Sequence, residues 1–296
     1  VHDPNNPESI PDSEIRAVYV DKLKRIWIGT KSSGLVIFNQ STKMFTKIPL
    51  PGFTYVKTIF EDINGHIWVG SFDTGGVARL IIDEKGDIVG RHMYDLPVGR
   101  STIVNPYLYF IFQDDKADLF VGTREGLFKW NKHDDLFELI PIGDSKFKES
   151  IGPYFVCIAR APDGRYWLGT IGGIIVCNRL EDIAKGEFKW YFSNRYEKTS
   201  LVDNSVTALY FDHSGLLWIG TDNGMDKYDP YWNQFKTVNS FSMVVDGRTP
   251  RISDYERTFD NKLLVGTHNS GLFLREMNRF KPIEKQFIEE DLKITV

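Results

Sequence analysis

The chain has 296 residues, of which 42% are hydrophobic and 26% are charged, and this composition excludes a disordered protein. The formal net charge is −4, which argues against a protein that binds the phosphate backbone of nucleic acid. No run approaches the ~18 consecutive apolar residues of a membrane-spanning helix, so we expect no membrane segment. Because the first residue is Val rather than Met, we expect the sequence to begin inside a longer precursor or after a removed signal.

One four-residue phrase recurs six times along the chain. In order, it reads Trp27-Ile-Gly-Thr30, Trp68-Val-Gly-Ser71, Phe120-Val-Gly-Thr123, Trp167-Leu-Gly-Thr170, Trp218-Ile-Gly-Thr221 and Leu264-Val-Gly-Thr267. Successive glycines of the phrase are separated by 41 to 52 residues, and they are Gly29, Gly70, Gly122, Gly169, Gly220 and Gly266. A period of this length indicates a repeat protein.

The segments around the phrase repeat as well. An alternating apolar run precedes it and predicts a first strand, as at 15–20, 56–60, 109–112, 155–158 and 206–210. A tight turn containing Asp separates the run from the phrase, at Asp21, Asp62, Asp114, Asp163, Asp212 and Asp260. A second Gly then opens a third strand, at Gly34, Gly76, Gly126, Gly173, Gly224 and Gly271. A fourth strand follows a polar turn, as at 44–48, 136–140 and 234–238.

Four short strands in each repeat, with no helical period, predict an all-β fold, namely a β-propeller of four-stranded antiparallel blades. The expected blades of one domain, 1–296, are residues 10–50, 51–100, 101–148, 149–200, 201–245 and 246–290. Six repeats fit a six-bladed propeller, or part of a seven-bladed or double propeller. We expect the phrase to be structural, with Trp filling the wedge between neighbouring blades and Gly permitting a close approach by another chain segment.

The two cysteines test this arrangement. Cys157 and Cys177 fall in the predicted first and third strands of one blade. Strands two apart are separated by roughly 9–10 Å, whereas a disulfide needs Cα atoms within about 7 Å. We therefore expect two free, buried thiols.

The repeat resembles that of the two-component regulator propeller family. The resemblance is clearest in Asp212-His-Ser-Gly-Leu-Leu-Trp-Ile-Gly-Thr-Asp-Asn-Gly224, and similar lead-in segments occur at 6–15 and 199–206. It extends over nearly the whole chain, and it is weakest in the third and sixth repeats, where Phe120 and Leu264 replace Trp.

This resemblance implies the extracytoplasmic sensor domain of a bacterial hybrid two-component regulator, located in the periplasm. Such sensors respond to oligosaccharides released from complex glycans, so an oligosaccharide or another small polar ligand is the implied partner. The other implied partners are further domains or a second propeller of the same protein, and a homodimer is an open alternative. The histidine kinase would lie outside this chain.

The candidate ligand residues lie on loops that we expect to meet at one face. The loops that follow the phrase contribute Lys31, Phe72, Asp73, Arg124, Glu125, Asp222, Asn223, His268 and Asn269. The loops that lead into first strands add Arg100, Tyr107, Tyr154, Arg248 and Arg251. Mixed charged, amide and aromatic groups suit a sugar or a uronate, although any surface loop can carry such residues.

Two other functions stay open. A propeller enzyme, such as a lyase or a glycan-active enzyme, would use loop residues as acid and base, for example His268 beside Arg124 or Glu125. A protein-interaction scaffold would bind a protein and no small ligand. We expect no enzymatic activity in this chain. The six scattered histidines lack zinc-site spacing and no phosphate-binding Gly-rich loop occurs, so neither metal nor cofactor is expected.

Overall fold

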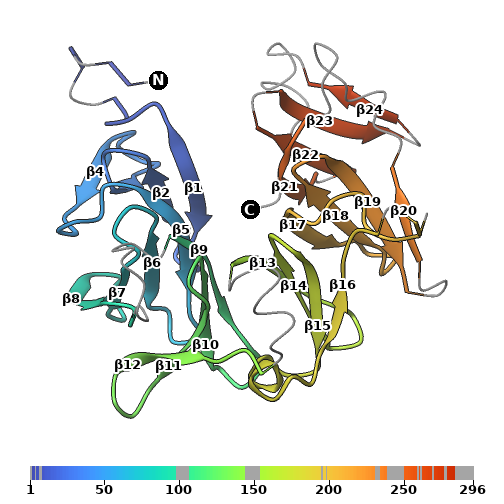
Figure 1. The fold of residues 1–296 in the computed structure, drawn as a ribbon. Coiled ribbons are helices and arrows are strands. Elements are labelled where there is room, and N and C mark those ends of the chain that lie inside the picture. The colour runs from blue at the N-terminus through green and yellow to red at the C-terminus, as the bar shows by residue number, and fades with distance from the viewer. Residues whose placement is uncertain are drawn as a thin grey trace. The chain divides into compact units, whose positions relative to one another are not determined.

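The computed structural model describes residues 2–3, 5–6, 9–97, 107–143, 154–194, 196–197, 199–230, 234–238, 250–258, 260, 262–268, 270–276 and 279–283. The chain divides into two compact units, 1–141 and 142–296, and each contains three four-stranded sheets (Figure 1). Every sheet is antiparallel, and its four strands follow one another in chain order. The expected fold class, an all-β propeller of six four-stranded antiparallel blades, is confirmed.

The first unit contains blades 1 to 3. Blade 1 consists of β1 (Ile15–Val20), β2 (Ile26–Thr30), β3 (Leu35–Phe38) and β4 (Phe45–Ile48). Blade 2 consists of β5 (Val56–Glu61), β6 (Ile67–Ser71), β7 (Val77–Ile82) and β8 (Ile88–Tyr94). Blade 3 consists of β9 (Leu108–Gln113), β10 (Leu119–Thr123), β11 (Leu127–Asn131) and β12 (Leu136–Ile140).

The second unit contains blades 4 to 6. Blade 4 consists of β13 (Phe155–Arg160), β14 (Tyr166–Thr170), β15 (Gly173–Cys177) and β16 (Lys189–Tyr191), with a 3-10 helix η1 (Leu180–Lys185) before β16. Blade 5 consists of β17 (Val206–Phe211), β18 (Leu217–Thr221), β19 (Gly224–Asp229) and β20 (Gln234–Thr237). Blade 6 consists of β21 (Ile252–Arg257), β22 (Leu263–Thr267), β23 (Gly271–Glu276) and β24 (Arg279–Pro282). The short helix is a departure from the expectation of no helix.

The glycine of the phrase permits one blade to touch the next. A Cβ atom built on Gly29 would lie 2.7 Å from Cγ1 of Val56, and one on Gly220 would lie 2.7 Å from Cβ of Ile252. Val56 and Ile252 are the first residues of the next blade's first strand. Carbon atoms pack at about 3.5–4.0 Å, so any side chain at these positions would push the blades apart. The expected close approach is confirmed.

The tryptophans of the phrase fill the wedge between blades. Trp27, Trp68, Trp167 and Trp218 are at most 1% exposed. The ring of Trp68 contacts Trp130 of the next blade at a centroid distance of 5.0 Å, and that of Trp167 contacts Tyr228 at 4.9 Å. A buried Trp removes about 150–250 Å² from water, worth on the order of 4–6 kcal/mol before entropic losses. The wedge assignment is confirmed.

An aspartate six residues before the Trp joins the hairpin turn to the wedge. Its Oδ2 accepts the indole N–H at 2.8 Å in three blades, from Asp21 to Trp27, Asp62 to Trp68 and Asp212 to Trp218. Its Oδ1 accepts backbone N–H groups of the turn, for example those of Asn64 and His66 at Asp62. One carboxylate therefore holds the turn and also fixes the ring.

Blade 4 lacks this carboxylate, because position 161 is Ala. The buried Nε1 of Trp167 has no hydrogen-bond partner among the described residues. Asp163 and Asp260 lie in turns, as expected, but not at the position from which the aspartates of blades 1, 2 and 5 bind the indole. Asp163 lies two residues later and binds Arg165, while in blade 6 the position belongs to Thr258, whose Oγ1 accepts the N–H of Lys262 at 2.9 Å.

Both cysteines are free, as expected. Cys157 lies in β13 and Cys177 in β15, and β14 separates them. Cys177 is buried as expected, whereas Cys157 is only partly buried. Burial raises the pKa of the Cys177 thiol to about 12 and that of Cys157 well above its ordinary value. Neither thiol is a nucleophile at neutral pH.

The close approach predicts different costs for two glycine substitutions. Gly70→Ala would place a methyl group against Leu108 of the next blade and 2.6 Å from Cγ2 of Thr58. We expect a loss of about 1–3 kcal/mol in the free energy of unfolding, measured by urea titration. Gly266→Ala is the matched control, since its nearest neighbour is Oγ of Ser253 at 3.1 Å, and it should cost less. Equal costs would contradict the role of the glycine.

The hydrogen bond from the Trp indole to the turn aspartate predicts that two aspartate substitutions differ in their cost to stability. Asp62→Ala would leave the buried indole of Trp68 unpaired and remove the acceptor of the turn, at a cost of about 1–3 kcal/mol in unfolding free energy. Asp163→Ala removes a carboxylate from the corresponding turn of blade 4, where it pairs only with the half-exposed Arg165, and should cost less than about 1 kcal/mol. Thermal unfolding of both variants measures the difference. A smaller effect at Asp62 would refute this account.

Candidate functional site

One backbone hydrogen bond fixes where the candidate loops lie. The N–H of the residue after the phrase donates to the carbonyl of the residue that precedes the first strand of the same blade. The pairs are Lys31 to Glu14, Phe72 to Tyr55, Arg124 to Tyr107, Asp222 to Ser205 and His268 to Arg251, at 2.9–3.1 Å. The two predicted sets of loops therefore meet at one end of each of these blades, which we call the loop face.

The threonine of the phrase closes the loop that follows it. Its Oγ1 donates to the carbonyl of the Gly that opens the third strand, from Thr30 to Gly34, Thr123 to Gly126, Thr170 to Gly173, Thr221 to Gly224 and Thr267 to Gly271, at 2.7–2.9 Å. In blade 2 the corresponding Ser71 instead donates to Asp73. These hydrogen bonds hold the backbone of the loop after the phrase in one conformation, which orients the side chains of the loop.

A β-bulge recurs beside the loop face. In all six blades the pairing of the first and second strands skips one residue, the second of the first strand. These residues are Arg16, Lys57, Tyr109, Val156, Thr207 and Ser253. A bulge bends its strand and redirects a side chain, and bulges are frequent next to binding sites. The alternating pattern of the sequence did not reveal this feature.

Three aromatic rings contact one another in sequence along the loop face of the first unit, with one pair tilted and the other stacked. Phe72 lies between Tyr55 and Tyr107, with ring centroids at 4.8 and 4.6 Å. Tyr109, at the bulge, meets Phe72 edge-on at 5.8 Å. All four side chains are half-buried, so each ring keeps part of its surface open to solvent. The predictions from sequence included Phe72 and Tyr107 but missed Tyr55 and Tyr109.

An arginine flanks each end of these rings. The guanidinium of Arg16 lies 5.4 Å from the ring centroid of Tyr55, and that of Arg124 lies 5.4 Å from that of Tyr107. We call Arg16, Tyr55, Phe72, Tyr107 and Arg124 the loop-face row. Glu14 binds Arg16 and also Lys31, both at 2.8 Å, and these interactions lower the pKa of the Glu14 carboxyl. Sequence reasoning missed Arg16 because only its bulge position brings it to the row.

Two acidic candidates of the first unit have local roles. Asp73 accepts hydrogen bonds from Thr54, Ser71 and the N–H of Thr74. Burial alone would raise the pKa of Asp73, but these bonds lower it below its usual range, so the carboxylate is charged and engaged in its own loop. Glu125 is half-buried, and its N–H donates to Oγ1 of Thr123 at 3.0 Å.

The loop face of the second unit carries an ion pair instead of stacked rings. Asp222 binds Nε of Arg251 at 2.5 Å and accepts from Oγ of Ser205 at 2.6 Å. Asn223 and His268 are exposed, and Tyr154 is half-buried. Arg100, Arg248 and Asn269 lie outside the described residues. His268 belongs to the second unit, whereas Arg124 and Glu125 belong to the first, so their suggested acid–base role stays a hypothesis.

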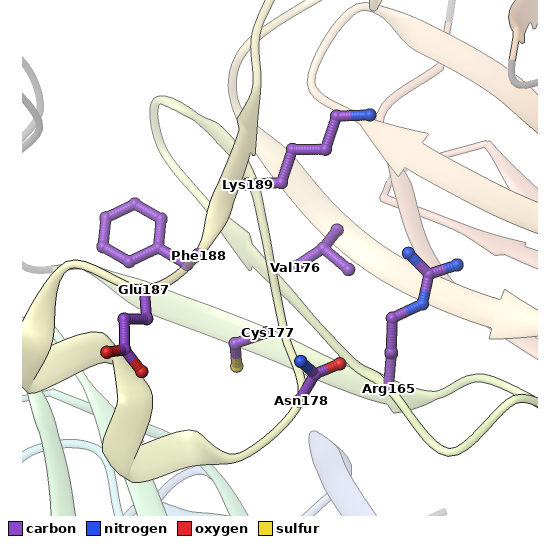
Figure 2. A pocket seen from close by; sticks show the side chains of 7 residues that line it. All are labelled: Arg165, Val176, Cys177, Asn178, Glu187, Phe188 and Lys189. Atoms are coloured by element: carbon purple, nitrogen blue, oxygen red, sulfur yellow. The ribbon is translucent and has the colours of Figure 1, made fainter.

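Blade 4 contains a hollow of about 320 Å³ that the sequence did not predict. It lies where η1 is inserted between β15 and β16, and Figure 2 shows Arg165 and Lys189 extending to one side and Glu187 to the other. Arg165 is held by Asp163 at 2.7 Å, and the Lys189 ammonium lies 4.6 Å from the ring centroid of Tyr191. Phe188 is the single aromatic ring among the seven described residues that line it, whereas the loop-face row has three rings.

No three His, Cys, Asp or Glu side chains are grouped as metal ligands in the part of the chain that the structure describes. No helix among the described residues has the length and the apolar character that crossing a membrane requires.

Several solved structures share this fold. A catalytically inactive virginiamycin B lyase from Staphylococcus aureus, solved with quinupristin, aligns with a TM-score of 0.67 and 12% identity over 95% of this chain and 87% of its own. PorZ, a surface component of the type-IX secretion system of Porphyromonas gingivalis, aligns with a TM-score of 0.62 and 14% identity over 92% and 41%. The extracellular domain of a putative one component system from B. thetaiotaomicron aligns with a TM-score of 0.52 and 17% identity over 88% and 41%.

At these identities the likeness shows the fold alone, and this chain spans less than half the length of the last two proteins. No curated protein sequence matches the chain. The profile of the two component regulator propeller family matches residues 9–32, 52–73 and 200–223, which contain the first two strands of blades 1, 2 and 5. The repeats of blades 1, 2 and 5 therefore match the two component regulator propeller family.

Proposed function

We propose that this chain is the ligand-sensing propeller of an extracytoplasmic two-component sensor, and that the loop-face row of its first unit binds an acidic oligosaccharide released from a glycan. The family match supports the sensor part of the proposal. The periplasmic location is part of the same proposal. It draws on the structural likeness to an extracellular domain of a putative one component system.

The stacked rings support a sugar ligand. Sugars present apolar ring faces that pack on aromatic side chains, while their hydroxyl groups need polar partners nearby. Phe72 lies between Tyr55 and Tyr107, with centroids at 4.8 and 4.6 Å, so the uncovered parts of the three half-buried rings form one continuous apolar strip, and the two tyrosines add hydroxyl groups. Because the rings already pack on one another, little side-chain entropy is lost when a ligand binds.

The flanking cations favour an acidic sugar. Arg16 and Arg124 lie at the two ends of the rings, and a guanidinium can hold a carboxylate through two parallel hydrogen bonds. Glu14 binds both Arg16 and the exposed Lys31, so two cations share one carboxylate and the Arg16 end keeps a net positive charge. A uronate-containing oligosaccharide matches both the aromatic surface and this charge.

We propose that the row binds its ligand without turnover. Histidine, the residue that most often serves as general acid or base, is not among its five residues. A lyase function remains the alternative, since the chain shares its fold with virginiamycin B lyase. The aromatic surface favours the sensor. In that role, the ligand would shift the population of two arrangements of the full-length protein, and a kinase outside this chain would respond.

Calorimetric titration with uronate-containing oligosaccharides and their neutral counterparts tests this proposal. Phe72→Ala should weaken binding of the acidic series at least about tenfold, because it removes the central ring, and tenfold corresponds to about 1.4 kcal/mol. Arg124→Gln should weaken the acidic series more than the neutral one. Phe192→Ala, which removes an exposed ring that contacts Trp190 in the second unit, is the matched control and should leave the affinity unchanged.

Three outcomes would count against the proposal. One is an affinity that Phe72→Ala and Phe192→Ala reduce equally, since the row would then not be the binding surface. Another is chromatographic detection of a product from the added oligosaccharide, which would favour the lyase. The third is no binding of any member of either series together with a stable protein partner, which would favour a scaffold.

A further inference from the structure

A second small hollow lies between blades 5 and 6, at the opposite end of these blades from the loop face. It has a volume of about 50 Å³, and its lining includes Asp212, His213, Arg257 and Arg275. A water molecule occupies about 30 Å³ in the liquid, so the hollow has room for one or two waters or for the oxygen atoms of one small anion. Two of its lining side chains are cations.

Arg275 occupies a position that other blades fill with apolar or aromatic groups. The residue four positions after the Gly that opens the third strand meets the Trp of the preceding blade. In blade 3 this residue is Trp130, which contacts Trp68, and in blade 5 it is Tyr228, which contacts Trp167. In blade 2 it is Leu80, which belongs to the same core cluster as Trp27. In blade 6, the Arg275 guanidinium lies 4.5 Å from the ring centroid of Trp218. Packing alone would be satisfied by a leucine at this position.

Both arginines retain free donors. Stacking on the indole engages the face of the Arg275 guanidinium and leaves the N–H groups at its edge available. Arg257 donates from Nε to the hydroxyl of Tyr210 at 3.1 Å, which orients it and leaves its two terminal nitrogens. Within the described part of the chain, neither arginine has a carboxylate at ion-pair distance. By contrast Arg79, packed among the rings of Trp68, Tyr94 and Trp130, has Asp135 at 3.8 Å.

The carboxylate that lines the hollow is engaged elsewhere. Asp212 accepts from Oγ of Ser214 at 2.6 Å, from the N–H groups of Ser214 and Leu216, and from the indole of Trp218 at 2.8 Å. These bonds direct its oxygens to the turn and the wedge. Two guanidinium groups therefore face one hollow without a hydrogen-bonded counterion.

We propose that the hollow between blades 5 and 6 binds one small oxyanion, either a phosphate or sulfate group or a carboxylate. Its lining has preoriented donors from two strands: Arg275 of β23 fixed by its stacking on Trp218, and Arg257 of β21 fixed by Tyr210. Bidentate recognition of a planar or tetrahedral oxyanion is the arrangement for which arginine is best suited. This site is separate from the loop-face row and does not depend on the sugar-binding proposal.

Calorimetric titration with phosphate, sulfate and acetate, at constant ionic strength set by sodium chloride, tests the site. The unaltered chain should bind at least one of these anions, and Arg275→Leu should weaken that binding at least about tenfold. Arg275→Leu places at the wedge the residue found there in blade 2. Arg279→Leu removes an exposed cation of the same blade and is the matched control, with unchanged affinity. Comparing sulfate with acetate distinguishes a tetrahedral from a planar ligand.

A second variant covers the case in which Arg275→Leu does not fold. Arg257→Gln leaves the wedge intact and should also weaken binding at least about tenfold. No binding of any of the three anions by the unaltered chain would overturn the proposal. So would equal binding by Arg275→Leu and Arg279→Leu, or undiminished binding by Arg257→Gln, because the guanidiniums would then serve packing alone.

Discussion

The fold depends on the missing side chain at the glycine of the phrase. Its absence lets the first strand of the next blade pack directly against the backbone of the second strand. At Gly29, Gly70 and Gly220 the space that a Cβ would occupy is already filled by Val56, Leu108 and Ile252 of the next blade. This contact sets the spacing of neighbouring blades, and the spacing in turn sets the width of the wedge that the tryptophans fill. It also determines which loops come together, because each of these first strands begins at the loop face.

The repeats allowed the fold to be predicted, since Trp, Gly and Thr act through contacts that recur unchanged in each blade. Features in which a single blade differs from the repeat could not be predicted in this way. The β-bulge at Arg16 leaves no trace in the apolar pattern, because a bulge adds one residue without changing residue types. The indole of Trp167 lacks a hydrogen-bond partner among the described residues because position 161 is Ala, and the Asp of that turn, Asp163, lies two residues later. Contacts between blades, such as that of Phe72 with Tyr107, require the three-dimensional arrangement.

The same blades separate the groups that hold the wedge tryptophans from the candidate ligand residues along their length. The hairpin turns hold Asp21, Asp62 and Asp212, whose carboxylates fix the wedge tryptophans. Loop-face residues are free of that task and differ between the units: the first carries stacked rings between two arginines, and the second carries the Asp222–Arg251 ion pair. The structure brings the two predicted sets of loops together at one end of blades 1, 2, 3, 5 and 6, and the ligand-binding role of their residues stays a prediction. Their chemistry depends on which neighbours each blade brings to them.

The central functional claim is that the loop-face row is the ligand-binding surface. A crystal structure of the chain with a uronate-containing oligosaccharide tests this claim most directly. We predict a sugar ring packed on Phe72 or Tyr107, with its carboxylate bound by Arg16 or Arg124. A sugar bound in the blade 4 hollow beside Lys189, or on the loop face of the second unit with the row empty, would contradict the claim.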